Sequence, residues 1–136
     1  MRIDDQRTGL HDFMKKRVLL VEDHPDIIDL MRLELEMLGY DVSVATNGLQ
    51  AVEMASAGLP DLIVMDILLP KMDGFEASAR IRQNPSTQSI PILAATALYR
   101  DKDREKCLAS GCNDHIAKPF THRQLGNHIH RLLKDN

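Results

Sequence analysis

The chain has 136 residues, of which 43% are hydrophobic and 27% charged, with a formal net charge of −3 and a pI near 6.0. This length fits one domain, and the composition is that of an ordinary globular protein. With this negative net charge the chain lacks the basic surface that nucleic-acid binding requires, so we expect no nucleic-acid partner. No stretch approaches the ~18 apolar residues of a membrane span or resembles a secretory leader. We therefore expect a cytoplasmic protein without membrane contact.

The two cysteines, Cys107 and Cys112, stand close together in the sequence. Without a leader peptide they indicate reduced thiols rather than a disulfide framework. A zinc site would need two further ligands, and His115 alone does not supply them. We expect no zinc–thiolate site.

Short apolar runs alternate along the chain with longer segments of helical periodicity. The expected strands are residues 18–21, 42–45, 62–65, 92–95 and 115–117. The first, third and fourth runs are apolar throughout, as is typical of parallel strands that are covered on both faces.

Boundary residues mark the helices between these runs. Pro25 suits the first turn of a helix, and Gly39 suits the position just past its end. The helix expected between residues 98 and 110 ends at Gly111, and the last helix runs to about residue 133. Three pairs resemble capping boxes: Asn47 with Gln50, Asp73 with Glu76, and Thr121 with Gln124.

Five strands alternating with five helices predict a three-layer α/β domain over residues 17–134. Right-handed crossovers restrict the topology to doubly wound forms, among them the (βα)5 flavodoxin-like fold with a parallel sheet of order 2-1-3-4-5. In that order a ligand binds beyond the carboxyl ends of the strands, at the switch point between strands 1 and 3. Residues 1–16 are expected to form an N-terminal extension, either disordered or folded as an added turn.

Chemically capable side chains stand at the ends of four expected strands: Glu22 and Asp23, then Asp66, Thr96 and Lys118. Three carboxylates in one crevice repel one another, and a divalent cation relieves that repulsion. Magnesium fits because it takes one or two carboxylates together with waters and phosphate oxygens. Beside such an ion and Lys118, Asp66 can act as a nucleophile that forms an acyl phosphate. The Thr96 hydroxyl adds to the neutralisation of charge.

Four motifs carry these residues, at positions 18–23, 61–74, 95–97 and 117–120. In this order they resemble the receiver domain of response regulators, the CheY-like superfamily of two-component signal transduction. The likeness runs from about residue 16 to residue 133. It implies a phosphoprotein that takes its phosphoryl group from a histidine kinase or a histidine phosphotransfer protein. It also implies output through changed contacts with a downstream protein, and no turnover of an external substrate as an enzyme would perform.

The resemblance also assigns the metal ligands. It implies that Asp66 is the phosphoacceptor and that Mg²⁺ is bound by Asp23, Asp66 and the main-chain carbonyl of Leu68. Glu22 is expected to act on the ion through water. Each of these positions carries an oxygen donor, as magnesium requires.

Thr96 is implied to be the switch hydroxyl that follows the phosphoryl group, and Lys118 to pair with that group. The bond between Lys118 and Pro119 is expected to be cis. His115 stands where many receivers carry an aromatic residue that rotates on activation. We hypothesise that a histidine there, titrating near pH ~6.5, makes the output face sensitive to pH.

Apolar residues of the first helix form two groups. Ile28, Met31, Leu35 and Leu38 have the spacing of a core-facing stripe. Ile27 and Leu30 lie to the other side, and we interpret them as a docking patch for the phosphodonor. The alternative is that they are scattered exposed apolar residues, which are common on protein surfaces.

Leu68 and Leu98 stand two positions after Asp66 and Thr96 and are expected to flank the phosphoryl group. We predict that they restrict water access and slow the hydrolysis of the acyl phosphate. We expect no effector domain after Asn136 and therefore output by protein contact. The expected output surface carries a basic cluster of Arg100, Lys102, Arg104, His115 and Arg123.

Three other functions compete with this interpretation. A haloacid-dehalogenase-like phosphohydrolase needs a second aspartate two positions after the nucleophile, where this chain has Leu68. A nucleotide- or flavin-binding module lacks its glycine-rich signatures after strand 1. A receiver-like interaction module that takes no phosphate is disfavoured because every active-site residue is present.

Overall fold

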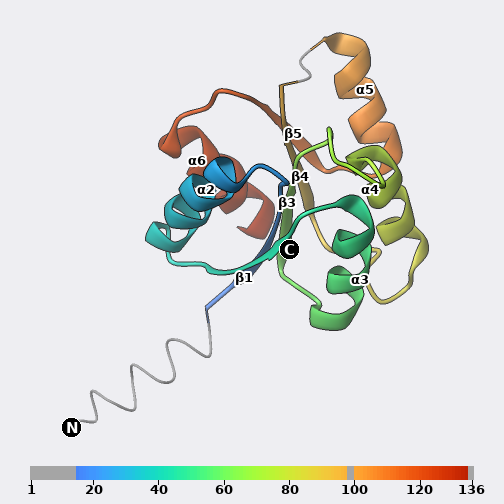
Figure 1. The fold of residues 1–136 in the computed structure, drawn as a ribbon, viewed down its shortest axis with the longest axis horizontal. Coiled ribbons are helices and arrows are strands. Elements are labelled where there is room, and N and C mark those ends of the chain that lie inside the picture. Colours follow the sequence, from blue (N-terminus) through green and yellow to red (C-terminus); the bar gives the residue numbers. More distant parts are fainter. Residues whose placement is uncertain (1–14, 98–99, 135–136) are drawn as a thin grey trace, which may run out of the picture.

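The structure is a computed structural model and describes residues 15–97 and 100–134. Within these residues five strands alternate with five helices (Figure 1). The strands are β1 (Arg17–Val21), β2 (Asp41–Ala45), β3 (Leu62–Met65), β4 (Ile92–Thr96) and β5 (Asp114–Ala117). The helices are α2 (Pro25–Met37), α3 (Gly48–Gly58), α4 (Gly74–Gln83), α5 (Asp101–Ser110) and α6 (His122–Lys134).

The strands form one parallel sheet in the order β2-β1-β3-β4-β5. Helices α2 and α6 cover one face of this sheet, and α3, α4 and α5 cover the other (Figure 1). The predicted three-layer α/β fold and its strand order are thus confirmed. Strands β3 and β4 are buried along their whole length, as central parallel strands covered on both faces should be.

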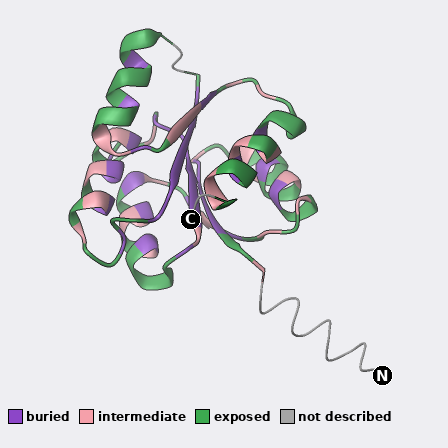
Figure 2. Cartoon of the chain, turned by 180° about the vertical axis from the view of Figure 1, so that it is seen from behind, coloured by how far each residue is buried: buried purple, intermediate pink, exposed green. Residues whose placement is uncertain are grey.

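The core consists of two apolar layers, one on each face of the sheet. Alternate residues of a strand point to opposite faces, so Leu19 packs toward α3 while Leu20 packs toward α2. Figure 2 shows the buried residues gathered along the strands and the inner sides of the helices. The two layers hold the sheet rigid, which fixes the positions of the residues at its carboxyl edge.

The helix boundaries follow the predicted caps, although only one of the three predicted capping boxes has both of its hydrogen bonds. Thr121 and Gln124 form the full capping box, since each backbone N–H donates to the side-chain oxygen of the other, at 2.8 and 3.1 Å. Asn47 accepts from the Gln50 N–H at 2.8 Å, but the Gln50 side chain accepts from Thr46 rather than Asn47. The reciprocal half of that box therefore lies one residue earlier than predicted.

Two glycines end helices as predicted. Gly39 follows α2 with φ of 97°, and Gly111 follows α5 with φ of 114°. These left-handed conformations favour glycine because they carry no penalty where there is no Cβ.

At the N-terminal side, the Lys16 carbonyl accepts a hydrogen bond from the Asp41 N–H at 2.9 Å, so ordered pairing with β2 begins at residue 16. Residues 1–14 of the predicted extension lie outside the described residues. Across the described part of the chain, none of the helices has the length and apolar character needed to cross a membrane.

Candidate functional site

The predicted site residues converge at the carboxyl edge of the sheet. Val21 and Met65 are in register on the adjacent strands β1 and β3, so Glu22 and Asp66 leave the sheet side by side. The Asp66 N–H donates to the Val21 carbonyl at 3.0 Å and fixes this arrangement. In folds of this type, ligands bind at the edge where the parallel strands end, next to the point at which the connections between strands change direction.

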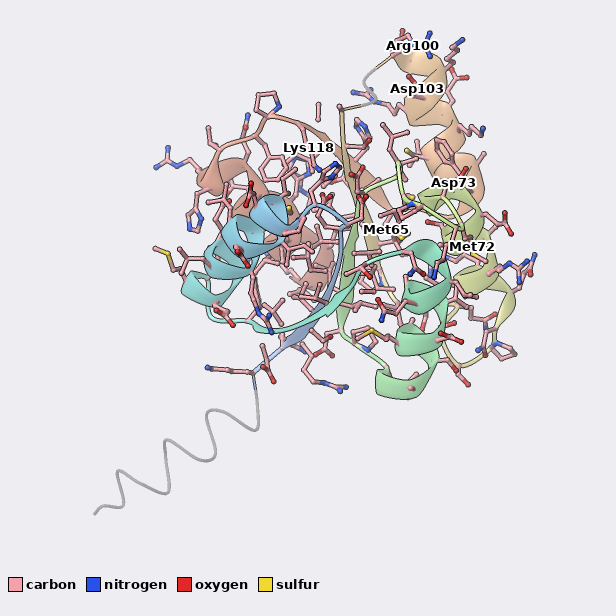
Figure 3. All side chains as sticks on the ribbon, in the orientation of Figure 1. Met65, Met72, Asp73, Arg100, Asp103 and Lys118 are labelled. Atoms are coloured by element: carbon pink, nitrogen blue, oxygen red, sulfur yellow. The ribbon has the colours of Figure 1, made fainter. Side chains whose placement is uncertain are left out.

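Lys118 reaches this edge from the end of β5 and contacts two carboxylates. Its Nζ lies 2.8 Å from Glu22 Oε1 and 3.4 Å from Asp66 Oδ2. Figure 3 shows Lys118 beside the carboxyl end of β3, where Met65 is labelled. The Lys118–Pro119 peptide bond is cis, as predicted. One cation is thus shared by two carboxylates of the site.

Glu22 is almost fully buried, with 1% of its surface exposed. Burial alone raises the pKa of its carboxyl group, but hydrogen bonds from Lys118 and His24 outweigh it, so the pKa lies below its ordinary value. Glu22 Oε2 also accepts from the backbone N–H groups of Asp23 and His24, at 3.1 and 3.3 Å. The side chain is therefore held as a carboxylate in a fixed orientation.

Asp23 presents an oxygen that the protein leaves unsatisfied. Its Oδ1 is buried and has no hydrogen-bond partner among the described residues. His24 Nδ1 lies 3.3 Å away but is hydrogen-bonded to Glu22 Oε2 instead, at 3.0 Å. A buried carboxylate oxygen without a donor is costly unless a cation meets it. The orphaned oxygen and the neighbouring carboxylates therefore fit a hard divalent cation.

Asp66 is 8% exposed, so little of its surface is accessible. Its Oδ1 accepts from the Leu68 N–H at 3.2 Å, and its Oδ2 faces Lys118. Thr96, the last residue of β4, is fully buried, and its carbonyl accepts from the Lys118 N–H at 3.0 Å. The structure thus brings together the predicted nucleophile, lysine and switch threonine.

The loop after Asp66 folds back tightly behind it. Asp73 caps α4 by accepting from the Glu76 N–H at 2.9 Å, as predicted. The Gly74 N–H donates to the Ile67 carbonyl at 2.8 Å, and a Cβ on Gly74 would lie 2.7 Å from the Asp66 carbonyl oxygen. Sequence reasoning assigned Asp73 and Gly74 only a cap and a turn and missed this close approach. The backbone at Gly74 therefore packs directly against the backbone of Asp66 and Ile67.

The proposed docking patch borders a groove of about 440 Å³ that opens beside the site. The groove is lined by Ile27, Leu30, Met31, Glu34, Ala97, Lys118, Pro119 and Phe120. Leu30 is 58% exposed, whereas Ile27 is half-buried and packs partly against the core. Met31 and Leu35 of the predicted core stripe are buried as predicted, whereas Ile28 is half-buried and belongs to neither core cluster.

Three further predicted residues are His115, Leu68 and Leu98. His115 lies within β5, half-buried and in register with Ala94. Leu68 follows Asp66 closely but is 57% exposed. Leu98 lies outside the described residues, so its predicted place near the phosphoryl group stays a prediction.

Comparisons with known proteins agree with this geometry. Residues 18–130 match the family described as the response regulator receiver domain. The chain is 39% identical over 118 residues to the DNA-binding dual master transcriptional regulator RpaA of Synechocystis. This match covers 87% of this chain and 49% of RpaA. It is also 39% identical over 118 residues to the sensor protein EvgS of Escherichia coli. That match covers 10% of EvgS. The chain thus spans about half of one relative and a tenth of the other.

Solved structures give the same result. The receiver domain of the sensor histidine kinase PA1611 from Pseudomonas aeruginosa, determined with magnesium in its active site cleft, superposes with a TM-score of 0.83 at 38% identity. That match covers 88% of this chain and 98% of the other. The chemotaxis response regulator CheY4 of Vibrio cholerae gives a TM-score of 0.83 at 28% identity, over 88% and 99% of the two chains. The chain belongs to the response regulator receiver domain family of two-component signalling.

Proposed function

We propose that the chain is a phosphoacceptor receiver whose Asp66 takes a phosphoryl group from a histidine kinase or a histidine phosphotransfer protein, in a reaction that depends on Mg²⁺. One observation carries this proposal. Asp66 Oδ2 lies 3.4 Å from the Lys118 ammonium, Glu22 stands beside it at the end of the adjacent strand, and the next residue, Asp23, carries a buried carboxylate oxygen without a partner. That is the arrangement in which a carboxylate nucleophile and a cation meet the same phosphoryl group.

The transfer exchanges one bond of phosphorus for another. An oxygen of Asp66 attacks the phosphorus atom, and the bond between phosphorus and the donor's histidine nitrogen breaks. That nitrogen keeps the bonding electron pair, and an acyl phosphate forms on Asp66. Lys118 neutralises charge on the phosphoryl oxygens, which is the main requirement of this chemistry.

Asp23, Asp66 and the Leu68 carbonyl would hold the magnesium ion directly, and Glu22 would hold it through water. When bound, the ion supplies further charge neutralisation at the phosphoryl oxygens. The contacts of Glu22 support its indirect role, because its Oε1 is already occupied by Lys118. The magnesium named for the PA1611 receiver domain is a precedent within the family.

After transfer, the new phosphoryl oxygens offer acceptors to two nearby donors. Thr96 supplies a hydroxyl from the end of β4, and Lys118 supplies its ammonium group. Movement of Thr96 toward the phosphoryl group would be passed to β5, whose His115 is the proposed switch position. An unknown downstream protein would read the changed surface, with no nucleic acid bound by this chain.

The groove beside the site is the proposed docking place of the phosphodonor. Leu30 offers an exposed apolar surface, and Ile27 forms part of the groove wall that continues to Lys118. A donor seated there would present its phosphohistidine toward Asp66. The proposed setting is the cytoplasm, where histidine kinases present their phosphorylated domains.

Two alternatives remain distinct from this proposal. The first is an interaction module that takes no phosphate, in which Asp66 would be only a structural residue. The second is an aspartyl-phosphate phosphohydrolase, disfavoured because Leu68 stands where a general acid is needed. We propose instead that the chain promotes only its own phosphorylation and dephosphorylation.

Localising the phosphoryl group tests the proposal directly. The chain would be treated with acetyl phosphate and Mg²⁺, reduced with borohydride to convert phosphoaspartate to homoserine, and mapped by peptide mass spectrometry. We expect homoserine at position 66 alone. Homoserine at another aspartate, or none in folded protein, would contradict the role of Asp66.

A further inference from the structure

A nitrogen donor stands beside the carboxylates of the cation site. His24 directly follows Glu22 and Asp23 and occupies the position before the first turn of α2, yet its side chain does not cap that helix. Its Nδ1 lies 3.0 Å from Glu22 Oε2 and 3.3 Å from Asp23 Oδ1. One ligand atom from each of these three residues lies within 4.8 Å of the others.

The two distances from His24 Nδ1 are those between neighbouring donor atoms on one small ion. Nitrogen and oxygen ligands bind first-row transition ions at about 2.0–2.2 Å, so neighbouring donors at right angles or tetrahedral angles are about 2.8–3.6 Å apart. Both distances from His24 Nδ1 fall in that range. An ion bound directly by His24 Nδ1 and Asp23 Oδ1, with Glu22 acting through water, therefore requires little rearrangement.

The orphaned oxygen gives a second observation. A hydrogen bond between His24 and Glu22 explains why those two side chains meet, but it leaves Asp23 Oδ1 without a partner. An ion held by the imidazole and by Asp23 Oδ1 would satisfy that oxygen as well. The His24 side chain is 64% exposed, so it can adjust its orientation toward an ion without disturbing the core.

The choice of ion follows from ligand chemistry. Carboxylate and carbonyl oxygens suit magnesium, whereas imidazole nitrogen suits cobalt, nickel, copper and zinc. We propose that His24 is a nitrogen ligand of the cation site, so that the site binds a first-row transition ion such as Co²⁺ more tightly than Mg²⁺. This inference rests on the proposed function for the existence of the site and adds its metal preference. The ion beside Asp66 then depends on which metals are available.

Metal titration of the unphosphorylated full chain tests this. The affinities for Co²⁺ alone and Mg²⁺ alone would be measured by calorimetry at about pH 8, because a metal-binding imidazole must be neutral. The chains compared are the wild type, His24→Gln and the control His130→Gln, which changes an exposed histidine on α6. We expect His24→Gln to reduce the ratio of Co²⁺ to Mg²⁺ affinity at least about tenfold, and His130→Gln to leave it unchanged.

The visible absorption of bound Co²⁺ gives an independent signal, since it changes when a nitrogen ligand is replaced by oxygen. Binding of both ions with the same ratio and the same spectrum in the wild type and His24→Gln would overturn the inference and leave the proposed function standing. Binding of neither ion, with Asp23→Asn equal to the wild type, would overturn both.

Discussion

Lys118 Nζ lies 2.8 Å from Glu22 Oε1 and thereby joins residues 96 positions apart in the chain. The distance from the same nitrogen to Asp66 is longer, at 3.4 Å. In this unphosphorylated state the lysine is held mainly by the buried glutamate. A phosphoryl group on Asp66 would offer Lys118 a more highly charged partner, so the lysine is placed to shift between the two carboxylates.

Replacing Lys118 by alanine should destabilise the fold because it leaves the Glu22 carboxylate buried without its cation. We expect a loss of about 1–3 kcal/mol in the free energy of unfolding, measured by urea denaturation. The double variant with Glu22→Gln should lose less, since no buried charge is then stranded. Lys102→Ala, an exposed lysine on α5, is the control and should change stability by less than about 0.5 kcal/mol. Equal stability of the Lys118 and Lys102 variants would show that the ion pair between Lys118 and Glu22 contributes nothing to the free energy of unfolding.

The same pair predicts a dependence of stability on pH. The pKa of Glu22 is lower in the folded protein than its ordinary value of 4.5, so the unfolded chain binds the proton more tightly. The contribution of Glu22 is therefore fully present above about pH 4.5 and is lost as the pH falls through the folded pKa. Urea denaturation between about pH 3 and 7 should show the wild type losing its advantage over Glu22→Gln toward low pH. A constant difference across that range would be incompatible with the lowered pKa.

Gly74→Ala should disturb the site because its Cβ would meet the Asp66 carbonyl oxygen and Ile67 Cα, each at 2.7 Å. Backbone atoms cannot yield cheaply, so we expect a loss of about 1–3 kcal/mol in stability and slower phosphorylation. Gly58→Ala is the matched control, because a Cβ there meets nothing within 4 Å. Denaturation midpoints and phosphorylation rates would be measured on both. If the two variants behaved alike, the packing behind Asp66 would not position it.

The docking groove predicts a difference between two kinds of phosphodonor. Leu30→Ala should slow transfer from a histidine phosphotransfer protein about tenfold or more, yet leave the rate with acetyl phosphate unchanged, because only the protein donor needs the groove. Leu33→Ala removes a leucine of similar exposure on α2, 55% against 58%, which does not line the groove. It should leave both rates unchanged. Equal slowing by the two variants would place the donor along α2 as a whole rather than at the groove.

The fold could be predicted because its signals are local. The continuous apolar runs of β3 and β4 and the capping residues Asn47, Asp73 and Thr121 identify elements without knowledge of their neighbours. Once the strands are parallel, residues that end them must meet at one edge. This is why Asp66 and Lys118 could be placed together from sequence.

What sequence reasoning missed depends on distances between segments. No local pattern shows that Lys118 contacts Glu22 more closely than Asp66, because a long side chain selects its partner in three dimensions. The close approach of Gly74 to Asp66 is equally a tertiary relationship. His24 offered a signal, an imidazole next to two carboxylates, that was available in the sequence but not used.

The central claim is that Asp66 accepts a phosphoryl group with the help of a divalent cation. The most direct measurement is the intact mass of the chain after incubation with acetyl phosphate, with and without Mg²⁺, beside Asp66→Asn. We predict the addition of one phosphoryl group to the wild type with Mg²⁺, and none to the variant or without the ion. A folded wild type that gains no mass, or a variant that gains the same mass, would contradict the account.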